Sequence, residues 1–142
     1  MPQISFSENG QTPFEKLLGH NPEILRHWAN LENVFFTKTN LSPELLEQVR
    51  RTLAFGNKCE YCMAKGKPNE IHKDKRESLA IGFAQLFVQD YISITDSQFD
   101  ILREEFTENE IAELCSFICF ITASQRFGAL MKLKPLEGGK RC

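Results

Sequence analysis

The sequence has no hydrophobic stretch long enough to cross a membrane. A membrane-spanning helix needs about 20 mainly apolar residues, whereas the most apolar run, Leu114–Ala123, is much shorter and includes Ser116 and Thr122. The N-terminal stretch MPQISFSENG has neither the basic start nor the apolar centre of a signal peptide. We therefore expect a cytoplasmic protein with no membrane partner.

The sequence also lacks a surplus of basic residues. Lys and Arg number 17 and Asp and Glu number 19, which gives a net charge of −2. Proteins that bind nucleic acid usually carry a positive surplus or a basic patch, so we expect no nucleic-acid partner. No Gly-rich phosphate loop follows a strand, because no strand is evident, and we expect no bound cofactor.

What remains is the composition of one globular domain. The chain has 142 residues, of which 42% are hydrophobic and 25% charged. Its 5 cysteines are an odd number, and only Cys59 and Cys62 are closely paired near a polar turn. In a reducing compartment, this pattern favours a redox or metal role over a framework of structural disulfides.

Start signals for helices recur along the chain. Asn21-Pro22 and Ser42-Pro43 each place a capping residue before a proline, and Thr95 and Thr107 each begin a capping box. We predict an all-α single domain of about six helices, with a loop at 91–95. The helices are predicted at 22–37, 43–56, a short segment with Cys59 and Cys62, 74–89, 95–106 and 107–133. We assign 1–19 to a partly mobile N-terminal segment, 20–134 to the helical domain and 135–142 to a flexible tail.

Two of these helices have apolar residues on most sides, at 79–88 and 111–123. A helix that is hydrophobic all round is buried on all sides, and a chain of this length has few other helices to cover two of them. We therefore predict an obligate oligomer. The alternative is a central helix that the other helices wrap within one subunit.

The spacing of Cys59 and Cys62 favours redox chemistry. On a helix, residues three apart lie on one face, where their thiols can form a disulfide. Gly56-Asn57 supplies a helix start just before them, and the positive end of a helix dipole favours the thiolate. Lys58 and Lys65 add positive charge nearby. One cysteine would attack a substrate and the other would resolve the product by closing a disulfide.

Two other interpretations of the pair stay open. The cysteines could be inert, or they could be half of a zinc site, in which case Cys115 with Cys119, His72 or Cys142 would supply the other half. Cys115 and Cys119 lie within an apolar run, where they look like two small buried residues that face the core.

The segments around the pair resemble a known family. LSPELLEQVR at 41–50 and NKCEYC at 57–62 look like the signature of the carboxymuconolactone decarboxylase / alkylhydroperoxidase-D-like family, which places a Glu twelve residues before the first cysteine, as Glu47 stands before Cys59. Segments at 78–84, 99–102, 106–114 and 126–127 follow in the family's order. The resemblance covers roughly residues 20–134.

The resemblance implies a small all-helical subunit that assembles into homotrimers or homohexamers. It implies thiol-dependent reduction of peroxides or small disulfides in antioxidant defence, with electrons from a thiol reductant protein or a dithiol. Cys62 would meet the peroxide, and Cys59 would form the disulfide and face the reductant. Glu47 would be the general base. The redox group would be the Cys59–Cys62 disulfide itself.

The sequence departs from the family where a His that relays protons usually follows the second cysteine by four residues. Gly66 stands there. Tyr61, by its hydroxyl, and Lys65, by its charge, are weak substitutes, and the chain's histidines are His20, His27 and His72. The missing His keeps open a non-catalytic redox sensor or assembly protein of the same fold. A lactone decarboxylase is a further alternative, although that branch usually lacks the CxxC pair.

The charged residues near the pair also have an ordinary interpretation. Arg50 and Arg51 follow Glu47 at the spacings of surface ion pairs on a helix, so Glu47 could be a solvated residue. Glu60, between the cysteines, is expected to face solvent. The basic residues of the following loop are either solvated or a docking surface for an acidic redox partner, and they are Lys65, Lys67, Lys73, Lys75 and Arg76.

Overall fold

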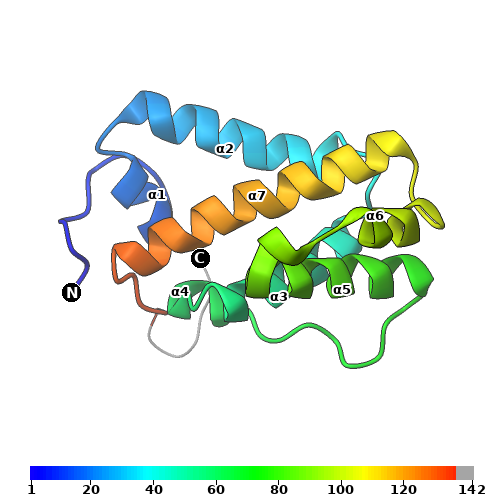
Figure 1. The fold of residues 1–142 in the computed structure, drawn as a ribbon. Helices are drawn as coiled ribbons and strands as arrows, with labels where there is room; N and C mark the ends of the chain where they lie inside the picture. The colour runs from blue at the N-terminus through cyan, green and yellow to red at the C-terminus, as the bar shows by residue number, and fades with distance from the viewer. Residues whose placement is uncertain (137–142) are drawn as a thin grey trace.

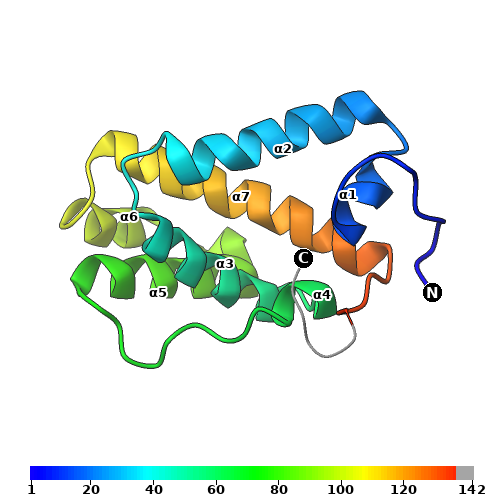
Figure 2. The same ribbon diagram turned by 180° about the vertical axis from the view of Figure 1, so that it is seen from behind.

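The longest helix, α7 (Glu108–Leu130), runs through the middle of the molecule. A computed structural model describes residues 1–136. In it, α2 (Pro22–Thr37) covers one side of α7, and α3 (Pro43–Gly56) and α5 (Lys75–Asp90) lie on the other (Figure 1). The view from behind shows the same arrangement (Figure 2).

Short elements complete the fold. They are α1 (Pro13–Leu18), α4 (Glu60–Met63), the 3-10 turn η1 (Tyr91–Ser93) and α6 (Asp96–Arg103). Within residues 1–136 the secondary structure is helical, with seven α-helices and no strand. The prediction of an all-α single domain is confirmed. The additional helix is α1, which we did not predict, and η1 occupies part of the predicted loop at 91–95.

The predicted start signals begin helices in the structure. The Asn21 side chain accepts hydrogen bonds from the backbone N–H groups of Glu23 and Ile24, and Thr107 and Glu110 form a capping box at the start of α7. Thr12 and Glu15 form another capping box, which begins α1. That signal was present in the sequence, but it lies in the polar N-terminal segment, where we expected no helix.

The segment 1–19 packs against the helices that follow it. The backbone N–H of Gln3 donates to the carbonyl of Met131 at 2.9 Å, and Leu17 and Leu18 of α1 are buried. The predicted tail begins at 135, and its residues 137–142, which include Cys142, lie outside the described part of the chain.

The main core lies between α7 and its neighbours. Leu46 and Leu53 of α3 and Phe117 and Ile118 of α7 are fully buried in it. One strip of α7 nevertheless stays exposed, formed by Ala112, Ser116, Cys119 and Ala123. In the described single chain, α7 is therefore wrapped on most sides but not on all, which leaves the predicted oligomer as a prediction. No helix among the described residues is both long enough and apolar enough to span a membrane.

The exposed strip corrects one prediction. Cys115 is half-buried but Cys119 is exposed, so the two do not both face the core. Residues four apart on an α-helix differ in direction by about 40°. That rotation is enough to carry Cys119 from the packed side of α7 to the exposed strip.

Candidate functional site

The CxxC pair lies where a tight turn after α3 leads into α4. Gly56 is the last residue of α3 and packs so closely on α5 that a Cβ there would lie 2.4 Å from the Val88 methyls. Lys58 then adopts a left-handed conformation, with φ of 54°, which redirects the chain. Cys59 follows as the N-cap of α4. The predicted end of the helix 43–56 at Gly56 is confirmed. The predicted start of the cysteine helix at Gly56-Asn57 is wrong, because the left-handed Lys58 intervenes and the helix begins after Cys59.

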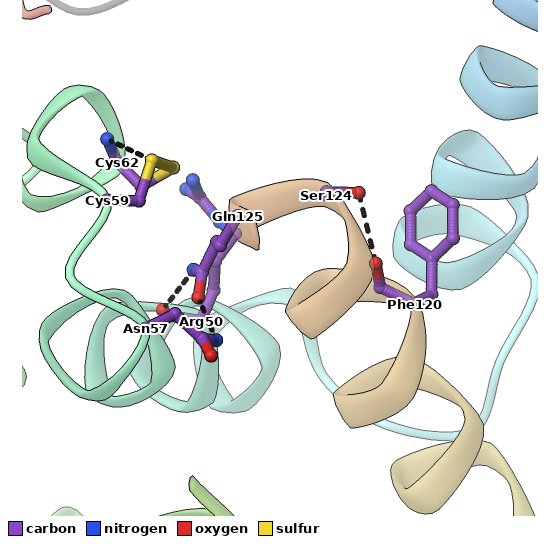
Figure 3. Close-up of a disulfide and its surroundings, with 7 residues drawn as sticks. All are labelled: Arg50, Asn57, Cys59, Cys62, Phe120, Ser124 and Gln125. Carbon is purple, nitrogen blue, oxygen red and sulfur yellow. Dashed lines mark hydrogen bonds between the residues drawn. A yellow bond between two sulfur atoms is a disulfide. The ribbon is translucent and has the colours of Figure 1, made fainter. Parts of the chain in front are cut away.

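The two cysteines are joined by a disulfide, with their Cα atoms 5.1 Å apart (Figure 3). Cys59 is fully buried, and its Sγ accepts a hydrogen bond from the backbone N–H of Cys62 at 3.3 Å. Cys62 is only half-buried. In this conformation, Cys62 is therefore the sulfur that another molecule reaches.

Cys62 lines a cavity of about 200 Å³ between α1, α2, α4 and α7. The apolar part of its wall comes from Phe14, Leu25, Trp28 and Ile121. Trp28 is held by a hydrogen bond of 2.9 Å from its Nε1 to Ser124 Oγ. Because α1 was not predicted, this wall was not predicted either. The polar part comes from Arg50, Lys65, Tyr61 and others, among them Glu15, Glu32, Ser124 and Gln125.

A chain of amide groups fixes the cysteine turn to α7. Asn57 Nδ2 donates to Gln125 Oε1 at 2.9 Å, and Gln125 Nε2 donates to the carbonyl of Arg50 at 3.0 Å (Figure 3). Arg126 Nε also donates to Asn57 Oδ1 at 3.2 Å. Gln125 is only 3% exposed, so its two hydrogen bonds are shielded from water, which strengthens them, whereas the Arg126 bond lies at the surface. They connect α3, the turn and α7 beside the disulfide.

Glu47 is held by two arginines and does not line the cavity with Cys62. Its carboxylate pairs with Arg50, and it accepts a hydrogen bond from Arg51 Nε at 2.9 Å. Burial alone would raise the pKa of Glu47, but the Arg51 hydrogen bond and the positive charge of Arg50 outweigh burial and lower it. Arg50 and Arg51 therefore both form the ion pairs with Glu47 that their spacings predicted. Arg50 connects Glu47 to the cavity, because Arg50 pairs with the carboxylate and also lines the cavity wall.

The position of the family's histidine has a backbone conformation that disfavours any side chain. Gly66 has φ of 99°, a left-handed conformation that favours glycine. A Cβ there would point toward Arg51 Nη1, at 3.8 Å. Lys65 and Tyr61, the two substitutes named above, both line the cavity, and Tyr61 is buried.

The three histidines lie away from the cavity, and none of them is among its lining residues. His20 Nε2 contacts the carbonyl of Ser5 at 2.6 Å. His27 is exposed beside Arg26 and Glu23, and His72 lies in the loop after α4. The structure therefore brings no histidine to the cysteine pair.

The other two cysteines of residues 1–136, Cys115 and Cys119, are free thiols on α7. Burial and the neighbouring Cys119 raise the pKa of the Cys115 thiol, which makes it a poor nucleophile at neutral pH. Among residues 1–136, no three His, Cys, Asp or Glu side chains come close enough together to hold a metal ion. Cys142 lies outside those residues.

Comparisons with known proteins support the fold. No family model matches the chain, and no curated protein matches its sequence. Among solved structures, it is similar to an uncharacterized peroxidase-related protein from Silicibacter sp. TM1040, with a TM-score of 0.76 and 18% identity over 87% of this chain and 75% of that one. The two chains therefore share a fold.

Proposed function

We propose that the chain is a thiol-dependent oxidoreductase that reduces peroxides or small disulfides through Cys59 and Cys62. The observation that carries this proposal is the asymmetry of the pair. Cys59 is buried and its Sγ accepts a backbone hydrogen bond, whereas Cys62 lines a cavity. The similarity in fold to a protein described as peroxidase-related supports it, as does the resemblance of the CxxC segment to the alkylhydroperoxidase-D-like family.

The chemistry would proceed in two steps, an oxidation of Cys62 and a condensation that closes the disulfide. The Cys62 thiolate attacks the O–O bond of a peroxide, takes one oxygen to become a sulfenic acid, and releases the other as water or an alcohol. The Cys59 thiol then condenses with the sulfenic acid, which releases water and forms the disulfide. The pair has lost two electrons, and the peroxide has gained them.

A dithiol would supply the two electrons that restore the pair. Because Cys59 is fully buried, the thiolate of the reductant attacks Cys62 and forms a mixed disulfide with it. Cys59 leaves as a thiolate, which the N–H of Cys62 stabilises. The second thiol of the reductant then resolves the mixed disulfide. In the alkylhydroperoxidase-D-like family the reductant would instead face the first cysteine, so this order of attack is a departure.

Charged residues of the cavity would activate Cys62. Arg50 and Lys65 line the same cavity as Cys62, and positive charge near a thiol lowers its pKa. Glu47 is paired with Arg50 and Arg51, so any role as a base would run through Arg50 or water. We therefore propose that Glu47 acts mainly by orienting Arg50, with Tyr61 as part of the buried wall.

The test is peroxide consumption with dithiothreitol as the reductant. We expect activity in the wild type, none above background in Cys62→Ser, and full activity in Cys119→Ser as the matched control. If the wild type consumes peroxide no faster than Cys62→Ser, the peroxidase proposal is wrong. Reversible reduction of Cys59–Cys62 together with a change in assembly would then favour a redox sensor, the alternative that Gly66 keeps open.

A further inference from the structure

The helix α7 approaches the disulfide at Gly128, a buried glycine near its C-terminal end. A Cβ built on Gly128 would lie 3.1 Å from Cys59 Sγ and 4.0 Å from Cys62 Sγ. Its remaining neighbour within 4 Å is Phe14 Cδ2, at 3.9 Å. The one tight contact that a side chain would make at this position is therefore with Cys59 Sγ.

We propose that Gly128 is a positioning residue that sets the balance between the disulfide and the dithiol at Cys59–Cys62. This inference rests on the proposed function, because it concerns how readily the same pair accepts and returns electrons. In its proposed role, Gly128 makes no contact with the substrate or the reductant. It acts by leaving room for Cys59 Sγ beside the backbone of α7.

The disulfide needs this room more than the dithiol does. When the bond is closed, Cys59 Sγ is tethered to Cys62 and cannot move away from α7. When the bond is open, Cys59 Sγ is no longer held by Cys62, and Cys62 can turn toward the cavity that it lines. A methyl group at position 128 would press on the tethered sulfur and would be relieved when the bond breaks. Gly128→Ala should therefore disfavour the disulfide relative to the dithiol.

The chain contains a matched control in Gly82, on α5. A Cβ at Gly82 would meet no atom of the described residues within 4 Å. Gly82→Ala thus makes the same chemical change in a helix interior without touching the cysteines. It separates the general effect of adding a methyl group to a helical glycine from the effect at the sulfurs.

The experiment measures the exchange of the protein disulfide with two glutathiones, which gives the protein dithiol and glutathione disulfide. Wild type, Gly128→Ala and Gly82→Ala are equilibrated in a series of glutathione redox buffers, and the dithiol fraction is determined by thiol labelling and mass spectrometry. We expect Gly128→Ala to shift the equilibrium constant toward the dithiol by about tenfold, and Gly82→Ala to match the wild type. Equal constants in all three proteins, or a shift toward the disulfide, would overturn the inference.

Two features of the design keep the results separable. If the wild type forms no reversible disulfide in these buffers, the proposed function fails, whereas a normal wild type with an unshifted Gly128→Ala defeats only this inference.

Should Gly128→Ala fold poorly, its melting temperature is compared in backgrounds with and without Cys59→Ala, a change that removes the sulfur. We expect the methyl group to lower the melting temperature clearly when Cys59 is present and only slightly when it is absent. A loss of the same size in both backgrounds would mean that the glycine serves packing alone, against the inference.

Discussion

The described chain carries two pairs of closely spaced cysteines, and they differ in backbone setting more than in spacing. Cys59 and Cys62 are three residues apart, straddle the start of α4 and form a disulfide. Cys115 and Cys119 are four apart, lie inside α7 and are free thiols. The first pair lies at a break in the helical path and beside a cavity, whereas the second lies on an unbroken helix.

The difference follows from helix geometry. Within a regular helix, residues four apart have Cβ atoms about 5–6 Å from each other, while a disulfide needs Cβ atoms about 3.5–4.5 Å apart. Cys59 escapes this limit because it is an N-cap with extended backbone, φ of −90° and ψ of 100°. Its side chain folds over the first turn of α4 toward Cys62. The cap position of Cys59 thus brings its Sγ to Cys62, whereas Cys115 and Cys119 inside α7 remain free thiols.

The largest effect that tests this comparison concerns which sulfur reacts. With Cys115, Cys119 and Cys142 changed to Ser, Cys59→Ser should react with an aromatic disulfide reagent about 100-fold faster than Cys62→Ser. The reason is that Cys62 lines the cavity and Cys59 is fully buried. Stopped-flow absorbance of the released thiol gives both rates. Similar rates would mean that the turn opens in solution and that the two sulfurs are equivalent.

A smaller effect is expected within the second pair. In a background without Cys59, Cys62 and Cys142, Cys119 should be alkylated by iodoacetamide about tenfold faster than Cys115 at neutral pH. Burial and Cys119 both raise the pKa of the Cys115 thiol, so the alkylation rate of Cys115 should keep climbing at alkaline pH, above the range in which an ordinary thiol is already ionised. Peptide mass spectrometry separates the two sites. Protection of Cys119 would show that something covers the exposed strip of α7.

Glu47→Gln should weaken the region of the first pair and leave the second unaffected. The side chains of Glu47 and Arg51 are each 24% exposed, and losing the carboxylate should lower the free energy of unfolding by about 1 kcal/mol at neutral pH. The pKa of Glu47 is lower in the folded state than in the unfolded state. The stability that its carboxylate contributes is therefore fully present above the unfolded-state pKa, and it is lost as the pH falls through the folded-state pKa. The wild type and the variant should therefore converge in urea titrations below the ordinary value of 4.5.

The exposed Glu44, one turn earlier on α3, provides the control for this prediction. Glu44→Gln should leave the free energy of unfolding nearly unchanged. If Glu47→Gln keeps a constant offset from the wild type at every pH, the loss is one of packing and not of charge pairing.

The smallest effect is expected at the left-handed turn before Cys59. Lys58 and Lys132 have φ of 54° and 55°, so glycine at either position should raise the free energy of unfolding by about 0.5–1 kcal/mol. Chemical denaturation of the two variants checks this. A slower reaction of Cys62 in Lys58→Gly, but not in Lys132→Gly, would show that the Lys58 charge also favours the thiolate.

Most of the fold was predictable from local signals. Asn21, Ser42 and Thr107 begin helices where their capping patterns predict them, because a cap depends on only the next few residues. The CxxC pair was found in the same way. The helix α1 was missed although Thr12 and Glu15 form a capping box, since its six residues are too few to show an apolar periodicity.

The assembly into a trimer or hexamer stays a prediction. Exposed apolar side chains on α2, namely Ile24, Leu31 and Val34, with Tyr91 and Ile92 on η1, are compatible with it. Light scattering would measure the mass directly, and a monomer of 16.3 kDa would contradict the prediction.

The sequence by itself determined the all-helical fold, most of the helix starts and the close spacing of Cys59 and Cys62, because each depends on residues near one another in the chain. Only the tertiary structure decided which sulfur is buried, that Glu47 binds two arginines away from the cavity, and that Gly128 lies against the disulfide. These facts depend on where α7 and α1 pack, and the residues concerned are far apart in the chain. Local sequence patterns do not specify which distant residues come into contact. These contacts are therefore known only from the packed tertiary structure.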